Sequence, residues 1–452
     1  MPHVRFTRNQ SWRLVALLAL GMVPLLSVPG AGTGARSGIV PAAPGVARDL
    51  AAVDPATVGV SADRLTRLTG GMRRMVTDGR LAGIVTLAAR HGKVVSFEAY
   101  GRQDIRTAES MARDSIFRIY SMTKPITGVA MMMLFEEGKW RLDDPVSKFI
   151  PEFGRLRVYA GENADGTLRL EDQRRSMTMR ELMTHSAGLG YGLTSANPVD
   201  RMYRDAKVLD SSASLQQMID GLAKLPLLAQ PGTRWAYSIA VDVQGYLVEK
   251  LSGRKFDVFL KERIFDPLGM KDTAFHVPSA KLGRVARIHG EGKNGTPDPP
   301  SDEAPGGGVF ADPTRVPVGP SGGGGLFSTA EDYLRFCQML LDGGTFGGTR
   351  LLAPRTVEMM RTNHLQAEPL RTYRPGQGFG LDFSIVMDAG EAGVATPNGT
   401  YYWAGAAGTW FWIDPETDLV FVGMIQHRGS AVADVQGLSR NLIYQAIVDP
   451  GR

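Results

Sequence analysis

The spacing of hydrophobic residues after residue 60 changes from a helical to a strand-like pattern. After Ser61, the apolar positions Leu65, Leu68, Met72 and Val76 share one helical face and predict an amphipathic helix. The next phrase, GIVTLAARHGKVVSFEAYG, contains strand-like runs on either side of a His-Gly pair. Such a pair between β-prone runs predicts a hairpin.

The order of the elements along the chain predicts the fold class. Strand-like runs return late, in GFGLDFSIVM and YYWAGAAGTWFWIDPETDLVFVGMIQ, before a helix from about Ala431 to Val448. Between the two sets of strands, over about 143–310, helical phrases alternate with polar loops. This order predicts an α/β (α+β) fold, with helices flanking one antiparallel sheet built from both termini and a mostly helical second lobe. A cleft between such lobes is a common ligand site.

The phrase FRIYSMTKPITG places a serine, a lysine and a proline at the start of a predicted helix. Proline is tolerated near a helix start, so Pro125 indicates that the helix begins close to Ser121. Residues three apart share a helical face, which puts Ser121 and Lys124 side by side at the positive end of the helix dipole. This is a favourable place for a nucleophile, although a capping serine with a surface lysine would look the same.

Two other serines compete with Ser121. Ser252 also precedes a lysine by three positions, but its neighbour Gly253 is typical of a loop between helices. Ser321 lies in Gly-Pro-Ser-Gly-Gly, which fits the G-x-S-x-G elbow of other hydrolases. That elbow needs a strand before it and a helix directly after it, whereas this stretch has the composition of a flexible glycine loop.

Two further phrases supply groups that a serine nucleophile needs. A base must take the serine proton, and lysine or tyrosine can do so if burial and a neighbouring cation lower their pKa values. Tyr237, in RWAYSIAVDVQGYLVEKLSG, stands just before an amphipathic helix. The run Trp403-Ala404-Gly405-Ala406, on a late strand, has small residues through which backbone N–H groups could reach an oxyanion.

The N-terminus has the features of a secretory signal. Three arginines precede the apolar run LVALLALGMVPLLSV, small residues follow up to Ala35, and Pro24 interrupts a run already too short for a bilayer span. We therefore expect a signal peptide over 1–35, an Ala/Pro/Gly-rich linker over 36–58, and one domain over 59–450. The expected protein is exported, periplasmic or secreted, with no stable membrane span.

Charge and cysteine content narrow the function classes. The formal charge of +5 includes the three arginines of the predicted leader, which holds no acidic residue, so 5 − 3 = +2 remains. This is too little to indicate nucleic-acid binding. The single cysteine, Cys337, lies in an apolar helical phrase and predicts a buried thiol. His185 lacks paired metal-ligand spacing, so we expect neither a metal nor a cofactor.

Seven phrases in order resemble the serine hydrolases related to class C β-lactamases, and most of all the family VIII carboxylesterases. They are FRIYSMTKPITG, LDDPVSKFIPEF, ELMTHSAGLGYG, RWAYSIAVDVQGYLVEKLSG, ERIFDPLGMKDTAF, GGGGLFSTAEDYLRFCQMLLDGG and WAGAAGTWFWIDP. The resemblance covers about 55–448. It implies that Ser121 is acylated, that Lys124 and Tyr237 exchange its proton, and that the N–H groups of Ser121 and Ala406 form the oxyanion hole.

The chain departs from the lactamase pattern at two motifs. Tyr237-Ser238-Ile239 stands where lactamases have Tyr-x-Asn, and Trp403-Ala404-Gly405 stands where they have Lys-Thr-Gly. Both departures occur in the esterase-like branch. We therefore expect hydrolysis of a small acyl ester, with Ile239, Trp403, Gly405 and Tyr191 lining the substrate site. A β-lactamase or D-alanyl-D-alanine peptidase, and a non-catalytic protein that binds cell-wall fragments, stay open as alternatives, and the sequence does not give the oligomeric state.

Overall fold

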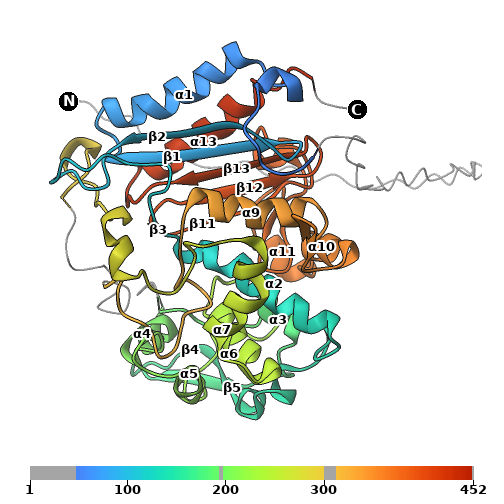
Figure 1. Ribbon diagram of the computed structural model, residues 1–452. Coiled ribbons are helices and arrows are strands. Elements are labelled where there is room, and N and C mark those ends of the chain that lie inside the picture. Colours follow the sequence, from blue (N-terminus) through green and yellow to red (C-terminus); the bar gives the residue numbers. More distant parts are fainter. Residues whose placement is uncertain (1–46, 193–196, 300–311, 450–452) are drawn as a thin grey trace, which may run out of the picture. The chain divides into compact units, whose positions relative to one another are not determined.

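A seven-stranded antiparallel sheet organises the computed structural model, which describes residues 47–192, 197–299 and 312–449. The strand order is β2-β1-β13-β12-β11-β10-β9 (Figure 1). The bounds in chain order are β1 Gly83–Arg90, β2 Lys93–Gly101, β9 Gln377–Phe379, β10 Ser384–Val386, β11 Tyr401–Ala404, β12 Trp410–Asp414 and β13 Leu419–Met424. The predicted leader lies outside the described residues.

Strands from the two ends of the chain meet inside this sheet. Strand β1 pairs with β13, with Val85 opposite Met424, and both strands are buried along their whole length. The predicted hairpin between β1 and β2 turns through His91 and Gly92, which both have positive φ. The prediction of one antiparallel sheet assembled from both termini is confirmed.

Helices cover both faces of the sheet. Helices α1 (Ala62–Thr77) and α13 (Ala431–Tyr444) contact each other on one face, at the top of Figure 1. Ser61 caps α1, and the predicted apolar face of α1 is buried against the sheet. Helix α9 (Ala330–Leu341) lies on the other face, where it packs on β13 and buries Cys337.

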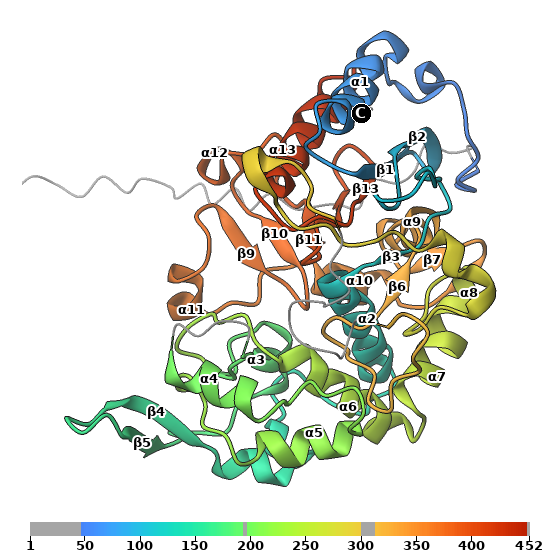
Figure 2. The ribbon, with the colours of Figure 1, turned by 90° about the vertical axis from the view of Figure 1, so that its left-hand side faces the viewer.

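The second lobe is mostly helical, as predicted, and surrounds helix α2 (Thr123–Glu136). Every residue of α2 from Thr123 to Leu134 is buried, because the helix is apolar almost all round. The other helices of the lobe are α3 Met179–Met183, α4 Pro198–Asp205, α5 Leu215–Leu222, α6 Ala240–Ser252, α7 Phe256–Leu260 and α8 Asp266–Leu268. A hairpin of β4 (Arg157–Glu162) and β5 (Leu168–Asp172), absent from the prediction, projects from the lobe in Figure 2.

The described part of the expected linker is held on the domain. Residues 47–58 contain a 3₁₀ turn, Pro55–Val58, which the Asp54 side chain caps. Arg48 forms ion pairs with Asp342, at 2.5 Å, and with Asp418, at 2.6 Å. The prediction of a loose linker is therefore wrong for this part, because charged residues distant in sequence provide partners that composition does not reveal.

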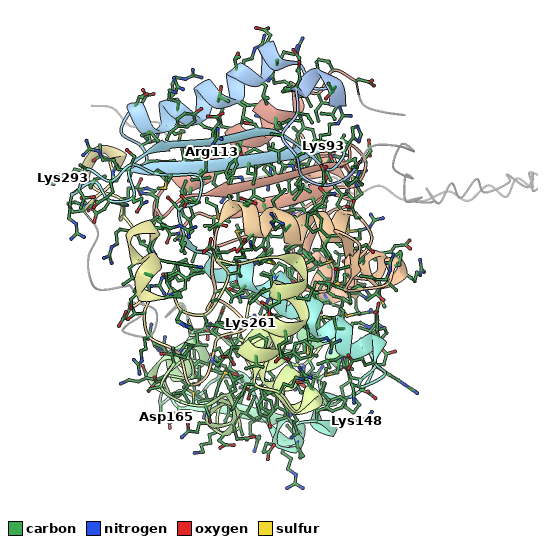
Figure 3. The ribbon with its side chains drawn as sticks, viewed as in Figure 1. Lys93, Arg113, Lys148, Asp165, Lys261 and Lys293 are labelled. Carbon is green, nitrogen blue, oxygen red and sulfur yellow. The ribbon has the colours of Figure 1, made fainter. Side chains whose placement is uncertain are left out.

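Charged side chains are spread over both lobes. Figure 3 labels Lys93 near the sheet, and Lys148, Asp165 and Lys261 on the helical lobe. The lysines have acidic partners, with Lys93 paired to Asp49, Lys148 to Asp144 and Lys261 to Asp266. Among the described helices, none combines the length and apolar character needed to cross a bilayer.

Candidate active site

Ser121 lies at the entry to α2, as predicted. It is the central residue of a 3₁₀ turn, Tyr120–Met122, that leads directly into the helix, and Pro125 lies in the first helical turn. Tyr120 has a φ of 43°, a region that non-glycine residues rarely occupy. Its hydroxyl accepts a hydrogen bond from Arg428 at 3.0 Å. Backbone strain of this kind often occurs at functional sites, and here it directly precedes the candidate nucleophile.

The structure brings Ser121, Lys124 and Tyr237 together. The Tyr237 hydroxyl donates a hydrogen bond of 2.7 Å to Ser121 Oγ, and Lys124 Nζ lies 3.5 Å from the same oxygen. Tyr237 lies three residues before α6, and α6 packs against α2. The packing of α6 against α2 therefore brings Tyr237 and Lys124, the two candidate proton-transfer residues, to the hydroxyl of Ser121.

Lys124 is almost completely buried, and its ammonium group contacts three oxygens. Nζ donates to Gly323 O at 2.7 Å and to Tyr191 Oη at 3.1 Å, in addition to Ser121. Burial alone lowers the pKa of Lys124, but Tyr191, Tyr237 and Asp242 outweigh it, so that the pKa lies above its ordinary value. Lys124 therefore does not meet the condition of a lowered pKa that a lysine base requires, because buried oxygens rather than a second cation surround Nζ.

An aromatic cluster fixes the ring of Tyr237. The rings of His185, Tyr191 and Trp403 lie 4.9, 5.3 and 5.7 Å from it. His185 Nδ1 accepts the backbone N–H of Ser238 at 3.2 Å, so it orders the residue next to Tyr237. Burial, and then the Lys124 charge, lower the pKa of His185 well below its usual value. His185 is therefore a neutral packing residue at this site.

The end of β11 approaches the Ser121 turn closely. A Cβ added to Gly405 would lie 2.3 Å from Ile119 O, so only glycine fits there. Ala406 follows at an exposed position, and within the described residues its N–H donates to no protein acceptor. The Ala406 N–H therefore follows a residue that packs against the chain two positions before Ser121, and it is free to bind a substrate oxygen.

The expected substrate-lining residues take different positions. Tyr191 is 9% exposed and bonds to Lys124, and Trp403 is 7% exposed and contacts the Tyr237 ring. The Trp403 indole N–H is buried and has no partner among the described residues. Ile239 is fully buried in the main core at the start of α6. A side chain without exposed surface at this position gives no support to the prediction that Ile239 contacts substrate.

The two rival serines have structural contacts. Ser252 ends α6, and its hydroxyl donates to Val248 O at 2.6 Å. Ser321 lies in a turn, with no strand directly before it and no helix directly after it in the described chain, and its hydroxyl donates to Asp242 Oδ1 at 2.5 Å. Neither hydroxyl has the base partners that Ser121 has.

Three groups near Lys124 were not predicted: Asp242, Asp382 and the Gly323 carbonyl. Asp242 and Asp382 are both buried, and the charge of Lys124 opposes the rise that burial causes in the pKa of each. A signal for Asp242 exists in the sequence, since it is an acid on the otherwise apolar first turn of α6. No comparable signal exists for Gly323, whose carbonyl contacts Lys124 across 199 positions.

Comparison with known proteins identifies the family. The Beta-lactamase family model matches residues 68–444. Protein Rv1367c of Mycobacterium tuberculosis is 37% identical over 79% of this chain and 88% of its own length. Esterase EstB of Burkholderia gladioli is 32% identical over 80% of this chain and 90% of its own length.

Solved structures share the fold. EstCE1, described as a hydrolase with promiscuous acyltransferase activity, has a TM-score of 0.70 and 28% identity over 84% of this chain and 99% of its own. Simvastatin synthase LovD of Aspergillus terreus has a TM-score of 0.73 and 23% identity over 85% of this chain and 98% of its own, which indicates a common fold. The match over most of the domain, with a serine, a lysine and a tyrosine in contact at the start of α2, shows that the chain belongs to the β-lactamase family, as a serine hydrolase similar to the family VIII carboxylesterases.

Proposed function

We propose that the protein is an exported carboxylesterase that forms an acyl-enzyme on Ser121. The observation that carries the proposal is the 2.7 Å contact between Tyr237 Oη and Ser121 Oγ beside the Lys124 ammonium. A serine hydroxyl is a weak nucleophile until a base takes its proton. The ammonium lowers the cost of forming a phenolate at Tyr237, which makes the tyrosine the base and the lysine its charge partner.

The reaction proceeds through two acyl transfers. Tyr237 first loses its own proton to solvent and becomes a phenolate beside the Lys124 ammonium. It then takes the proton of Ser121 as Oγ attacks the ester carbonyl carbon, and the N–H groups of Ser121 and Ala406 bind the oxyanion. Collapse of this intermediate breaks the bond to the alkoxy group, which leaves with the proton from Tyr237. Water then gives a proton to the Tyr237 phenolate as its oxygen attacks the acyl carbon. Collapse of this second intermediate breaks the bond to Ser121 Oγ, which takes the proton back from Tyr237, and the acid leaves.

The groups around the cleft favour a neutral ester as substrate. Trp403 replaces the lysine that helps lactamases to bind a carboxylate, and its N–H is buried. Ile239 replaces the asparagine that binds an amide, and its side chain lies in the core. Small acyl esters need neither contact, and two relatives are named as esterases.

Labelling and turnover test this function together. The purified mature chain should hydrolyse short-chain aryl esters, and a fluorophosphonate should label Ser121. Ser121→Ala should abolish both results, whereas Ser252→Ala, which removes a helix-end hydroxyl, should keep them. Activity that survives in Ser121→Ala would reject the assignment.

Acyl transfer to an alcohol is a second candidate activity. Several relatives are named as acyltransferases, among them one at 26% identity over 81% of this chain. The half-buried rings of Trp235 and Tyr237, which stack with their centres 6.1 Å apart, offer apolar surface to an organic acceptor, which would compete with water for the same acyl-enzyme. Adding alcohols to the esterase assay and measuring transesterified product would test this activity.

Export is proposed from the leader sequence. The basic residues, apolar run and small residues of 1–35 are those of a signal peptide. Mature protein recovered from a native-like host should begin near residues 31–36. An intact Met1 on that material, measured by mass spectrometry, would contradict the proposal.

A further inference from the structure

The shortest contact of the Lys124 ammonium is with a backbone carbonyl. Nζ lies 2.7 Å from Gly323 O, 3.1 Å from Tyr191 Oη and 3.5 Å from Ser121 Oγ. An ammonium group has three donors, so these three acceptors account for all of them. The position of the Gly323 carbonyl therefore decides how far Nζ lies from Ser121.

Asp242 holds the segment that carries this carbonyl. Its Oδ1 accepts the Gly323 N–H at 3.0 Å and the Ser321 hydroxyl at 2.5 Å. A Cβ added to Gly323 would lie 2.4 Å from Asp242 Oδ2, and one added to Gly322 would lie 2.5 Å from Val241 O. The glycines thus allow this segment to press against the first turn of α6.

Asp242 also supplies negative charge to a buried cation. The residue has no exposed surface, and Oδ2 has no hydrogen-bond partner among the described residues. Burial raises the pKa of Asp242, and the charge of Lys124, the Ser321 hydroxyl and the Gly323 N–H act against that rise. A buried charge needs a compensating charge. The attraction is reciprocal, so a carboxylate here favours the protonated form of Lys124.

The other titratable groups that face Lys124 do not supply this charge. Burial raises the pKa of Tyr191 and favours its neutral phenol, and the Tyr237 hydroxyl, which donates to Ser121, is charged only when it acts as the base. His185 is neutral because burial lowers its pKa. Asp382 accepts from Gln244 at 3.1 Å, but burial raises its pKa well above the usual value and favours the neutral acid. The pKa of Asp242 also lies above its ordinary value, but the Lys124 charge, the Ser321 hydroxyl and the Gly323 N–H oppose the effect of burial, so Asp242 is the better held of the two in its ionised form.

We propose that Asp242, together with Ser321, is a positioning residue of this site: it sets the Gly323 carbonyl against the Lys124 ammonium and keeps that ammonium protonated beside Tyr237. The inference rests on the proposed function and extends it to two residues that do not contact substrate. It also gives a role to the Gly-Pro-Ser-Gly-Gly stretch, whose serine orders a turn instead of acting as a nucleophile.

The decisive variant is Asp242→Asn in the full mature chain. The amide keeps the shape but removes the charge, so Lys124 should lose its proton at lower pH. We expect kcat for an aryl ester to fall at least tenfold, with KM within about twofold, as for a group that acts only on the chemical step. The alkaline limb of kcat/KM against pH should move at least one pH unit lower. A folded Asp242→Asn protein with the wild-type pH profile overturns the proposal.

Ser321→Ala is the second variant and keeps the carboxylate. It should lower kcat several-fold, because the turn loses one anchor, and should leave the alkaline limb in place. Ser252→Ala removes a matched hydroxyl outside the site and should change neither quantity. If Asp242→Asn does not fold, a wild-type kcat in Ser321→Ala overturns the proposal.

The rate of fluorophosphonate labelling separates this inference from the proposed function. If wild-type Ser121 is not labelled, the proposed acyl-enzyme chemistry fails. If it is labelled, and Asp242→Asn is labelled at the same rate with the same pH dependence, only the positioning role fails.

Discussion

The hydroxyl groups of Tyr237 and Ser121 lie 2.7 Å apart although 116 positions separate them in the sequence. The contact depends on two helix starts that face each other, that of α2 after Ser121 and that of α6 after Tyr237. The Lys124 ammonium lies over the Tyr237 ring, with Nζ 4.6 Å from the ring centre. One proton path therefore runs through residues that two packed helices hold in place.

Tyr237→Phe and Lys124→Ala should each lower turnover by about two or more orders of magnitude, the usual scale for a general acid–base group. Their effects should not add, because both act on one proton path. Kinetics of the two single variants and of the double variant would measure this. A double variant with the full product of both losses would instead indicate independent roles.

Gly405→Ala should lower kcat about 100-fold, the scale of losing one oxyanion donor. The new methyl group would lie 2.3 Å from Ile119 O, so the β11 end and the Ala406 N–H must move away from Ser121. Gly221→Ala is the matched control, because a Cβ there meets nothing within 4 Å. The control should keep full activity and stabilise α5 slightly. Unchanged kcat in Gly405→Ala would argue against the oxyanion assignment.

Asp418→Asn should destabilise the fold in a pH-dependent way. Burial alone raises the pKa of Asp418, but Arg48 and His91 outweigh it and lower the pKa to about 2. Against an unfolded value of about 3.9, this corresponds to about 2 kcal/mol. Because the folded-state pKa is depressed, the contribution is fully present above about pH 4 and is lost as the pH falls towards 2.

Denaturant unfolding of wild-type and Asp418→Asn chains at several pH values would measure this difference. Asparagine tolerates the positive φ of 51° at this position, so the turn should keep its backbone. Glu416→Gln, exposed in the same turn, should leave stability unchanged. A stability gap between wild type and Asp418→Asn that does not shrink on acidification would contradict the ion-pair explanation.

Short acyl esters should exceed cephalosporins and D-alanyl peptides by at least about 100-fold in kcat/KM. A charge-assisted hydrogen bond contributes about 1.5–3 kcal/mol and an unpaired buried polar group costs about 1–3 kcal/mol. A β-lactam or D-alanyl peptide that lacks partners for its carboxylate and amide therefore loses several kcal/mol of binding free energy. At about 1.4 kcal/mol per tenfold, this loss corresponds to a factor of at least about 100. Parallel assays with a chromogenic cephalosporin and an aryl ester would measure the ratio, and comparable values would refute the prediction.

The sequence predicted the elements whose signals are local. Pro125 marked the start of α2, and the His91-Gly92 pair marked the β1–β2 hairpin. Periodicity predicted the helices, and the order of the elements predicted the sheet. These features follow from backbone restrictions and from the spacing of hydrophobic residues, and both can be read from one continuous stretch of sequence.

Contacts between distant residues could not be predicted in this way. The direction of the Lys124 pKa depends on Asp242 and Tyr191, which reach it from α6 and from the loop after α3. Ile239 occupies a motif position, but its orientation follows from the turn that begins α6. Arg48 lies in a stretch whose composition is typical of a loose linker, but in the folded chain it forms ion pairs with two distant carboxylates.

The pairing of β1 with β13 has a consequence for synthesis of the protein. Because these neighbouring strands come from opposite ends of the chain, the centre of the sheet cannot close until residues 419–424 have left the ribosome. A chain dominated by such long-range contacts folds slowly. A nascent chain therefore stays without its finished sheet throughout translation, and a product truncated before β13 should yield neither a stable domain nor an active hydrolase.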